Sequence, residues 1–218
     1  MRSDDPDVPL SRCTRCPRLA AHHQALRRQY PEHHLAPVPL WGARAPRILL
    51  VGLAPGLHGA ARTGRGFVGD ASGRFLFEAL HRVGLADSPD PDRAALRGTA
   101  ITNVVKCLPP GNAPVGAEVR NCRSYLDDDL DRLRWQRSRT DKVVVALGQV
   151  AYKATARALN LQVPAFGHAV AVPVTRHVTL LASFHPSRLN VNTRRLTASM
   201  LDAVLTRAAT TAGITGGV

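Results

Sequence analysis

Residues 142–148 read Lys142-Val143-Val144-Val145-Ala146-Leu147-Gly148, an unbroken apolar run that ends in glycine. Parallel strands that are buried on both faces have such continuous runs rather than an alternating pattern. The chain contains three more runs of this kind, at residues 47–52, 99–105 and 178–183. Apolar residues with helical spacing follow these runs over residues 73–83, 115–135, 149–159 and 194–208. The alternation predicts an α/β fold, a three-layer α/β/α sandwich around a central, mostly parallel four-stranded sheet.

The ends of the chain lack these patterns. We therefore expect one domain over residues 1–218, with an irregular N-terminal segment at 1–40 and a flexible tail at 210–218. No stretch approaches the length of a membrane span. The first five residues, Met-Arg-Ser-Asp-Asp, lack the apolar run of a secretory signal, so we expect a cytoplasmic protein.

The charge of the chain indicates its partner. Lys and Arg number 29 against 16 Asp and Glu, a net charge of +13, and arginine dominates the basic residues. An excess of this size favours a polyanion, and arginine can grip phosphate with two hydrogen bonds. The predicted partner is therefore a nucleic acid, and no membrane partner is expected.

The chain has four cysteines, two in a C-x-x-C pair and two far along the sequence: Cys13, Cys16, Cys107 and Cys122. A zinc ion, an iron-sulfur cluster, and disulfides or free thiols are all compatible with this spacing. A reducing cytoplasm disfavours the disulfides.

Polar side chains follow three of the predicted strands. The glycine-rich loop from Gly52 to Asp70 follows the first, Asn103 lies at the end of the second, and His185 follows the last. Ligands bind beyond the carboxyl ends of strands in open α/β sheets, so these residues should converge. The loop is neither a P-loop nor a dinucleotide fingerprint, and Asp70 could simply cap the helix that follows it.

Five motifs, in this order, resemble the uracil-DNA glycosylase superfamily, and more narrowly its iron-sulfur families 4 and 5. They are Cys13-Thr14-Arg15-Cys16, Gly52-Leu53-Ala54-Pro55-Gly56, Gly66-Phe67-Val68-Gly69-Asp70, Thr102 to Cys107 with Pro109 to Asn112, and His185-Pro186-Ser187. The resemblance runs from Cys13 to about Thr197. Leu53, where family 4 has an acidic residue, and Asp70 favour family 5. The chain departs from that family at Ala61, where Asn is expected, and at Arg188, where Pro is common.

The resemblance implies a cofactor and a reaction. Both families hold a 4Fe-4S cluster on four such cysteines, which assigns Cys13, Cys16, Cys107 and Cys122 as its ligands, with residues 1–40 as a cluster-binding segment. The implied activity is that of a monofunctional DNA glycosylase of base excision repair, acting on uracil and on other deaminated bases such as hypoxanthine. The implied partner is DNA that contains such bases, and we expect a monomer. No lysine is among the candidate catalytic residues, which argues against a Schiff base and lyase activity.

Hydrolysis of an N-glycosidic bond needs negative charge near the sugar cation and a hydrogen-bond donor near the departing base. Asp70 and His185 are the candidates for these two catalytic roles. The base must leave the stack, so Phe67 would stack on it and Asn103 would read its polar edge. The candidate substrate-binding residues are Gly52, Leu53, Ala54, Phe67 and Asn103.

The segment after His185 is the candidate DNA wedge. Leu189 would fill the gap left by the extruded nucleotide, and arginines beside it would contact phosphates. The candidate DNA-binding residues are Ser187, Arg188, Leu189 and Arg194, with Arg195 as a further phosphate contact.

Two other functions remain compatible with the residues. One is a non-catalytic nucleic-acid-binding module with a four-cysteine zinc site, and the other is a narrow family 4-like glycosylase specific for uracil. A small-molecule nucleotide hydrolase is disfavoured by the net charge and by the missing phosphate loop.

Overall fold

A computed structural model of the chain describes residues 9–133 and 137–214. Its centre is a six-stranded sheet of order β1-β3-β2-β4-β6-β5. The strands are β1 (Trp41–Gly42), β2 (Ile48–Gly52), β3 (Thr99–Asn103), β4 (Lys142–Leu147), β5 (Ala171–Thr175) and β6 (Val178–Ser183). The four inner strands are parallel and correspond to the four predicted runs, which confirms the predicted fold class.

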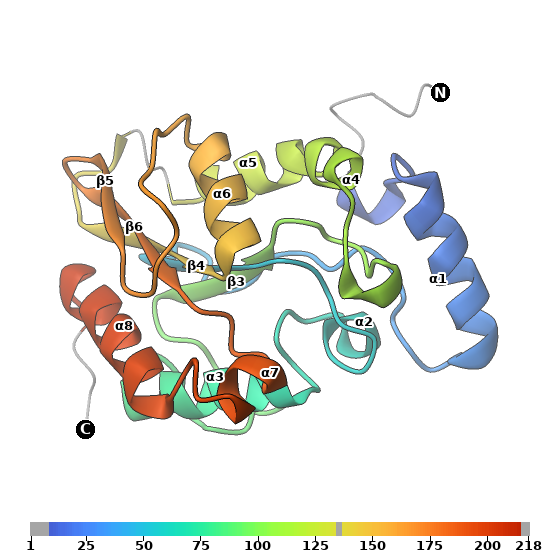
Figure 1. The fold of residues 1–218 in the computed structure, drawn as a ribbon, viewed down its shortest axis with the longest axis horizontal. Coiled ribbons are helices and arrows are strands. Elements are labelled where there is room, and N and C mark those ends of the chain that lie inside the picture. The colour runs from blue at the N-terminus through green and yellow to red at the C-terminus, as the bar shows by residue number, and fades with distance from the viewer. Residues whose placement is uncertain (1–8, 134–136, 215–218) are drawn as a thin grey trace.

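Helices cover both faces of the sheet, as Figure 1 shows. Above the sheet in that view lie α4 (Gly116–Asn121), α5 (Arg123–Asp131) and α6 (Gln149–Ala158). Below it lie α3 (Ala71–Arg82), α7 (Arg188–Asn192) and α8 (Ala198–Thr211). The shorter α2 (Ala60–Thr63) lies in the loop that follows β2, and α1 (Pro17–Gln29) lies at one end of the molecule. Short 3-10 helices span Leu10–Arg12 and Pro110–Asn112.

The continuous apolar runs have a simple cause. In β2, Ile48 and Leu50 pack into the core between the sheet and helices α3 and α8. Leu49 and Val51 point to the other face and pack into the core between the sheet and helices α5 and α6. Every residue of β2 and β3 is buried, because side chains on both faces of each strand meet a helix layer. None of the helices within the described ranges is long and apolar enough to cross a bilayer.

The two edge strands were not predicted, and both pair antiparallel with their neighbours. Strand β1 has only two residues. Strand β5 contains Pro173 and is mostly part-exposed, which removes the apolar signal and is tolerated only at an edge.

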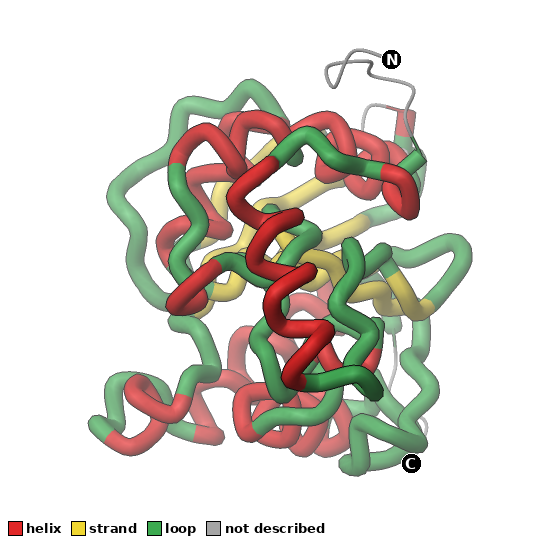
Figure 2. Tube along the Cα trace, turned by 90° about the vertical axis from the view of Figure 1, so that its right-hand side faces the viewer, coloured by secondary structure: helices red, strands yellow, loops and turns green. Residues whose placement is uncertain are grey.

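The prediction of an irregular segment at residues 1–40 is wrong for the helix α1. Only Leu19 and His23 of α1 are buried, so its apolar pattern is weak. Pro17 at its first turn and its good helix formers were the available signals. Figure 2, in which the right-hand side of Figure 1 faces the viewer, shows α1 crossing in front of the yellow strands.

The predicted helix at 115–135 is two helices, α4 and α5, which meet at Cys122. Its predicted end at Trp135 lies outside the described residues. The predicted tail at 210–218 is also partly wrong. Helix α8 continues to Thr211, the Gly213 carbonyl accepts a hydrogen bond from Arg47 (2.9 Å), and Ile214 packs against the core. Residues 215–218 lie outside the described residues.

Candidate active site and cysteine cavity

The carboxyl ends of the inner strands surround a cavity of about 290 Å³. Gly52 and Asn103 are paired at the ends of β2 and β3, so sheet register alone brings the first loop beside Asn103. Six of the predicted site residues line the cavity together with Ser187: Leu53, Ala54, Phe67, Asp70, Asn103 and His185. The predicted convergence is therefore present.

Asp70 serves two purposes. Its Oδ1 accepts a hydrogen bond from the Gly73 amide (2.9 Å) and so caps α3. Its Oδ2 faces the loop at Gly56 and Gly59, where a Cβ on Gly59 would overlap it. The cap fixes the carboxylate at the wall of the cavity, and Gly59 leaves room for the second oxygen.

Phe67 is held in an uncommon backbone conformation, with φ at 59°. A Cβ on Gly52 would overlap both the Phe67 ring and the Asn103 amide oxygen. Gly52 therefore lies beneath the cavity and lets the ring and the amide approach each other. The Phe67 ring lies 5.7 Å from the His185 ring, centroid to centroid.

Asn103 and His185 present free polar groups to the cavity. Asn103 is 3% exposed, and within the described part of the chain neither its amide nor the His185 ring forms a hydrogen bond with protein. Burial lowers the pKa of His185, and nearby Asp70 opposes this shift only partly. With an ordinary value near 6.5, a lowered pKa leaves the imidazole neutral at pH 7.

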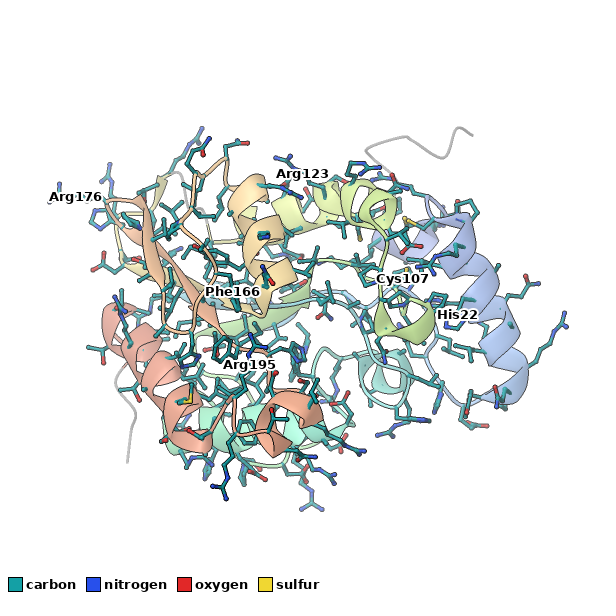
Figure 3. The ribbon with its side chains drawn as sticks, in the orientation of Figure 1. His22, Cys107, Arg123, Phe166, Arg176 and Arg195 are labelled. Atoms are coloured by element: carbon teal, nitrogen blue, oxygen red, sulfur yellow. The ribbon has the colours of Figure 1, made fainter. Side chains whose placement is uncertain are left out.

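The segment that carries His185 is fixed on both sides. The Phe184 amide donates to His168 Nδ1 (3.3 Å), and the Asn190 side chain donates to the His185 carbonyl (2.8 Å). The Arg195 guanidinium lies 4.8 Å from the Phe184 ring centroid, so this arginine contacts the segment itself. The Phe166 ring also contacts Phe184, with 5.9 Å between the ring centroids, and Figure 3 labels both Arg195 and Phe166.

The candidate wedge contains a short helix, α7, which the sequence analysis did not predict. Ser187 caps it by accepting from the Asn190 amide (3.4 Å). Leu189 is 71% exposed, and Arg188 and Arg194 are also exposed. An exposed leucine between exposed arginines, next to the cavity, is the arrangement expected of a wedge.

Four further residues line the cavity that the sequence did not single out as site residues: Gly56, Ala60, Ser72 and Asn112. Gly56 and Asn112 lie in motifs already noted, so position in a motif was the available signal. Lys106 also lies in a motif, but its Nζ is buried against Asp129 and it does not line this cavity.

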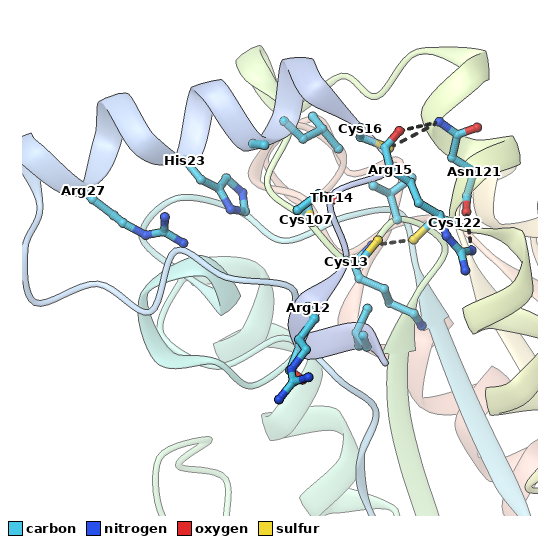
Figure 4. Close-up of a pocket in the computed structure, with 16 residues that line it drawn as sticks. Arg12, Cys13, Thr14, Arg15, Cys16, His23, Arg27, Cys107, Asn121 and Cys122 are labelled. Carbon is cyan, nitrogen blue, oxygen red and sulfur yellow. Dashed lines mark hydrogen bonds between the residues drawn. The ribbon is translucent and has the colours of Figure 1, made fainter. Parts of the chain in front are cut away.

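The four cysteines line a second cavity, of about 240 Å³. They come from the loop before α1, the loop after β3 and the junction of α4 and α5, and all are free thiols. Figure 4 shows the sulfurs of Cys13 and Cys122 pointing toward each other. No group of three His, Cys, Asp or Glu side chains in residues 9–133 and 137–214 is placed to hold a metal ion.

Polar contacts hold the N-terminal segment against α4 and α5 beside this cavity. Arg18 makes a two-pronged ion pair with Glu118 of α4 (2.8 and 2.9 Å), and Arg15 donates to Ser124 (2.7 Å). Asn121 donates to the Arg15 carbonyl (3.0 Å), as Figure 4 shows. His23 Nε2 accepts a hydrogen bond from the Leu108 amide (3.0 Å), which gives this histidine a structural role.

The thiol environment fits a group that binds thiolates. Burial raises the pKa of Cys107 to about 12 and that of Cys122 to about 11, so these thiols stay protonated unless a cation is near. A set of four thiolates is the donor set of iron-sulfur clusters and also of structural zinc. The cavity is several times the roughly 30 Å³ share of one water molecule, so it has room for a group larger than a single ion.

Comparison with known proteins gives one family. The model of the Uracil DNA glycosylase superfamily matches residues 39–209. A protein of Pyrobaculum aerophilum named Type-5 uracil-DNA glycosylase is 43% identical over 212 residues, which cover 94% of this chain and 91% of that protein. Proteins of the same name from Mycobacterium tuberculosis and Thermus thermophilus are 41% and 40% identical, each over 94% of this chain and over 80% and 96% of their own lengths.

The Type-4 uracil-DNA glycosylase of Pyrobaculum aerophilum is more distant. It is 39% identical over only 54% of this chain and 52% of its own length. The similarity thus extends over nearly the whole chain for type 5 and over about half of it for type 4, in agreement with the features at Leu53 and Asp70.

Proposed function

This chain belongs to the uracil-DNA glycosylase superfamily, and we propose that it hydrolyses the N-glycosidic bond of uracil in DNA at the cavity between β2, β3 and β6. The observation that carries the proposal is the meeting of Asp70, Phe67, Asn103 and His185 around one cavity. Proteins named type-5 enzymes, similar over nearly the whole length, support the same activity.

The roles follow from the positions of the polar atoms. Asp70 Oδ2, left free by the cap at Oδ1, supplies negative charge to the sugar cation and orients or deprotonates the attacking water. Neutral His185 donates a hydrogen bond to the base oxygen as negative charge develops there. Asn103 reads the polar edge of the base, and Phe67 stacks on the ring.

The proposed substrate range includes other deaminated bases, with hypoxanthine as the first candidate. An amide such as Asn103 offers both a donor and an acceptor, so it can pair with the edges of more than one base. A purine needs more room than uracil, and the cavity of about 290 Å³ extends to the half-buried Ser187, next to the exposed Arg188.

We also propose that Cys13, Cys16, Cys107 and Cys122 hold a 4Fe-4S cluster. Bound to these four thiolates, a cluster would link the segment before α1 to the junction of α4 and α5, and base excision would require no redox step from it. Purified protein should be brown and contain iron and acid-labile sulfide. A colourless protein with stoichiometric zinc would contradict the cluster and favour a zinc site.

Base release tests the function directly. Duplex oligonucleotides that carry uracil, hypoxanthine or only normal bases are incubated with the cluster-loaded protein, and alkali then cuts the abasic sites. Cutting at uracil and hypoxanthine is the expected result. Cutting at uracil alone would limit the range to that of a uracil-specific enzyme, and no cutting would leave a non-catalytic DNA-binding protein.

A further inference from the structure

Lys106 is a charged residue buried between the two cavities. It is 1% exposed, and its Nζ donates to Thr102 Oγ1 (2.5 Å), to the Asn103 carbonyl (2.9 Å) and to Asp129 Oδ2. These three acceptors use all three hydrogens of an ammonium group. Its main-chain amide donates to Cys122 Sγ (3.3 Å), so the same residue also contacts the cysteine cavity.

The partners of Lys106 belong to different elements. Thr102 and Asn103 end β3, whereas Asp129 lies on α5 and also accepts from Thr102 Oγ1 (2.6 Å). Lys106 therefore ties the last two residues of β3 to the helix above the sheet. The bond to the Asn103 carbonyl matters most, because the side chain of the same residue faces the base cavity.

Stability alone is a poor reason for such a network. A buried ion pair loses the hydration of both charges, and an apolar pair of similar volume is often as stable. A network with all its bonds made does fix a single geometry, and catalysis depends on geometry within a fraction of an ångström.

We propose that Lys106, together with Asp129, is a positioning residue that fixes Asn103 for reading the flipped base. The inference rests on the proposed function, because it assumes that Asn103 contacts the base. Lys106 acts through the Asn103 main chain and does not touch the substrate.

The test is a double-mutant cycle on uracil release. Lys106→Met should lower kcat/KM by about 10- to 100-fold, the usual effect of a misplaced site group. In an Asn103→Ala background, Lys106→Met should lower kcat/KM by no more than about twofold, because the effects of substitutions at coupled residues are not additive. Lys142→Met is the matched control, since Lys142 also donates to a main-chain carbonyl, that of Leu133, but from the first residue of β4.

A second readout measures binding without turnover. We would measure the ratio of two dissociation constants, one for undamaged duplex and one for duplex that carries a non-cleavable 2′-fluoro uracil nucleotide. Lys106→Met should reduce this ratio toward that of Asn103→Ala, with unchanged affinity for undamaged DNA. A merely structural role would weaken both affinities together.

A further variant covers the case in which Lys106→Met leaves Asp129 unpaired and unfolds the protein. The pair Lys106→Met with Asp129→Leu removes both charges, and it should fold while giving the same loss of kcat/KM and of the ratio. Additive losses in the cycle, or equal losses for Lys142→Met, would overturn the inference. If Asn103→Ala itself has no effect, the inference fails with the role of Asn103, while the base-release assay on the unchanged protein judges the function separately.

Discussion

The base cavity and the cysteine cavity are built in different ways. Strand ends and one helix cap position the residues of the base cavity, and the Asn103 and His185 side chains form no hydrogen bond with protein within the described residues. Packing of an N-terminal helix positions the cysteine cavity, and its surroundings are tied by the Arg18–Glu118 ion pair and by His23. Sheet register brings the ends of β2 and β3 together at the first site, whereas polar side-chain contacts between segments about 100 residues apart hold the second. Changes at the first should therefore alter the rate, and changes at the second should alter stability.

The largest effect on rate is expected from Asp70→Asn. Asparagine can still accept from the Gly73 amide, so α3 stays capped, but the negative charge beside the sugar is lost. We expect base release in single-turnover assays to fall by about 10³-fold, within the range that acid-base and electrostatic groups supply. Affinity for uracil-containing duplex should change little. Equal losses of rate and affinity would mean that Asp70 is only structural.

Leu189→Ala should have a smaller effect that depends on the substrate. A wedge fills the gap that the flipped nucleotide leaves in a duplex, and a single strand has no such gap to fill. We expect the rate of uracil release to fall by about tenfold on duplex DNA and by less than half that factor on single-stranded DNA. The matched control is Val150→Ala, an exposed apolar residue of α6. The same loss on both substrates would exclude a wedge.

Arg188→Ala should weaken DNA binding by a few fold. If Arg188 contacts one phosphate, the slope of log affinity against log salt should become shallower by about one. Arg176→Ala is the control, because Arg176 lies in the turn between β5 and β6, at the upper left edge of the molecule in Figure 3. An unchanged slope for Arg188→Ala would remove this residue from the phosphate contacts.

The smallest effect on rate is expected from Glu118→Gln, which separates the two regions. Hydrogen bonding to Arg18 lowers the pKa of Glu118, so the stabilisation is present above the unfolded value of about 4.5 and is lost as pH falls through the folded value. We expect the melting temperature to fall by roughly 2–4 °C at pH 7. The difference from the unchanged protein should vanish at low pH, and uracil release at 25 °C should be nearly unchanged.

Asp202→Asn provides the comparison for Glu118→Gln. Asp202 makes an equally short ion pair with Arg82, which joins α3 to α8 away from the cysteines. Both changes should lower the melting temperature, but only Glu118→Gln should lower the iron content after purification. Equal iron content in the two variants would mean that the Arg18–Glu118 pair does not support the cluster segment.

The parts of the fold that sequence reasoning missed have one feature in common. Helix α1, strand β5 and helix α7 each bury few of their own side chains, so they carry no apolar period to detect. The break at Cys122 was missed because α4 and α5 share a continuous apolar face. Strand pairing with β6 holds β5, the Arg18–Glu118 ion pair holds α1, and the Ser187 side chain caps α7. An apolar period in the sequence does not record such polar contacts.

The sequence by itself determined the four parallel strands at the centre of the sheet and most of the residues that line the base cavity. This was possible because buried strands need continuous apolar runs, and because the residues just after parallel strands must meet at one edge. Only the tertiary structure decided how those residues are held: the free Oδ2 of Asp70, the room left by Gly52 for Phe67, and the Lys106 network behind Asn103. These features depend on contacts and distances between segments that are distant in the sequence, and residue order alone does not specify them.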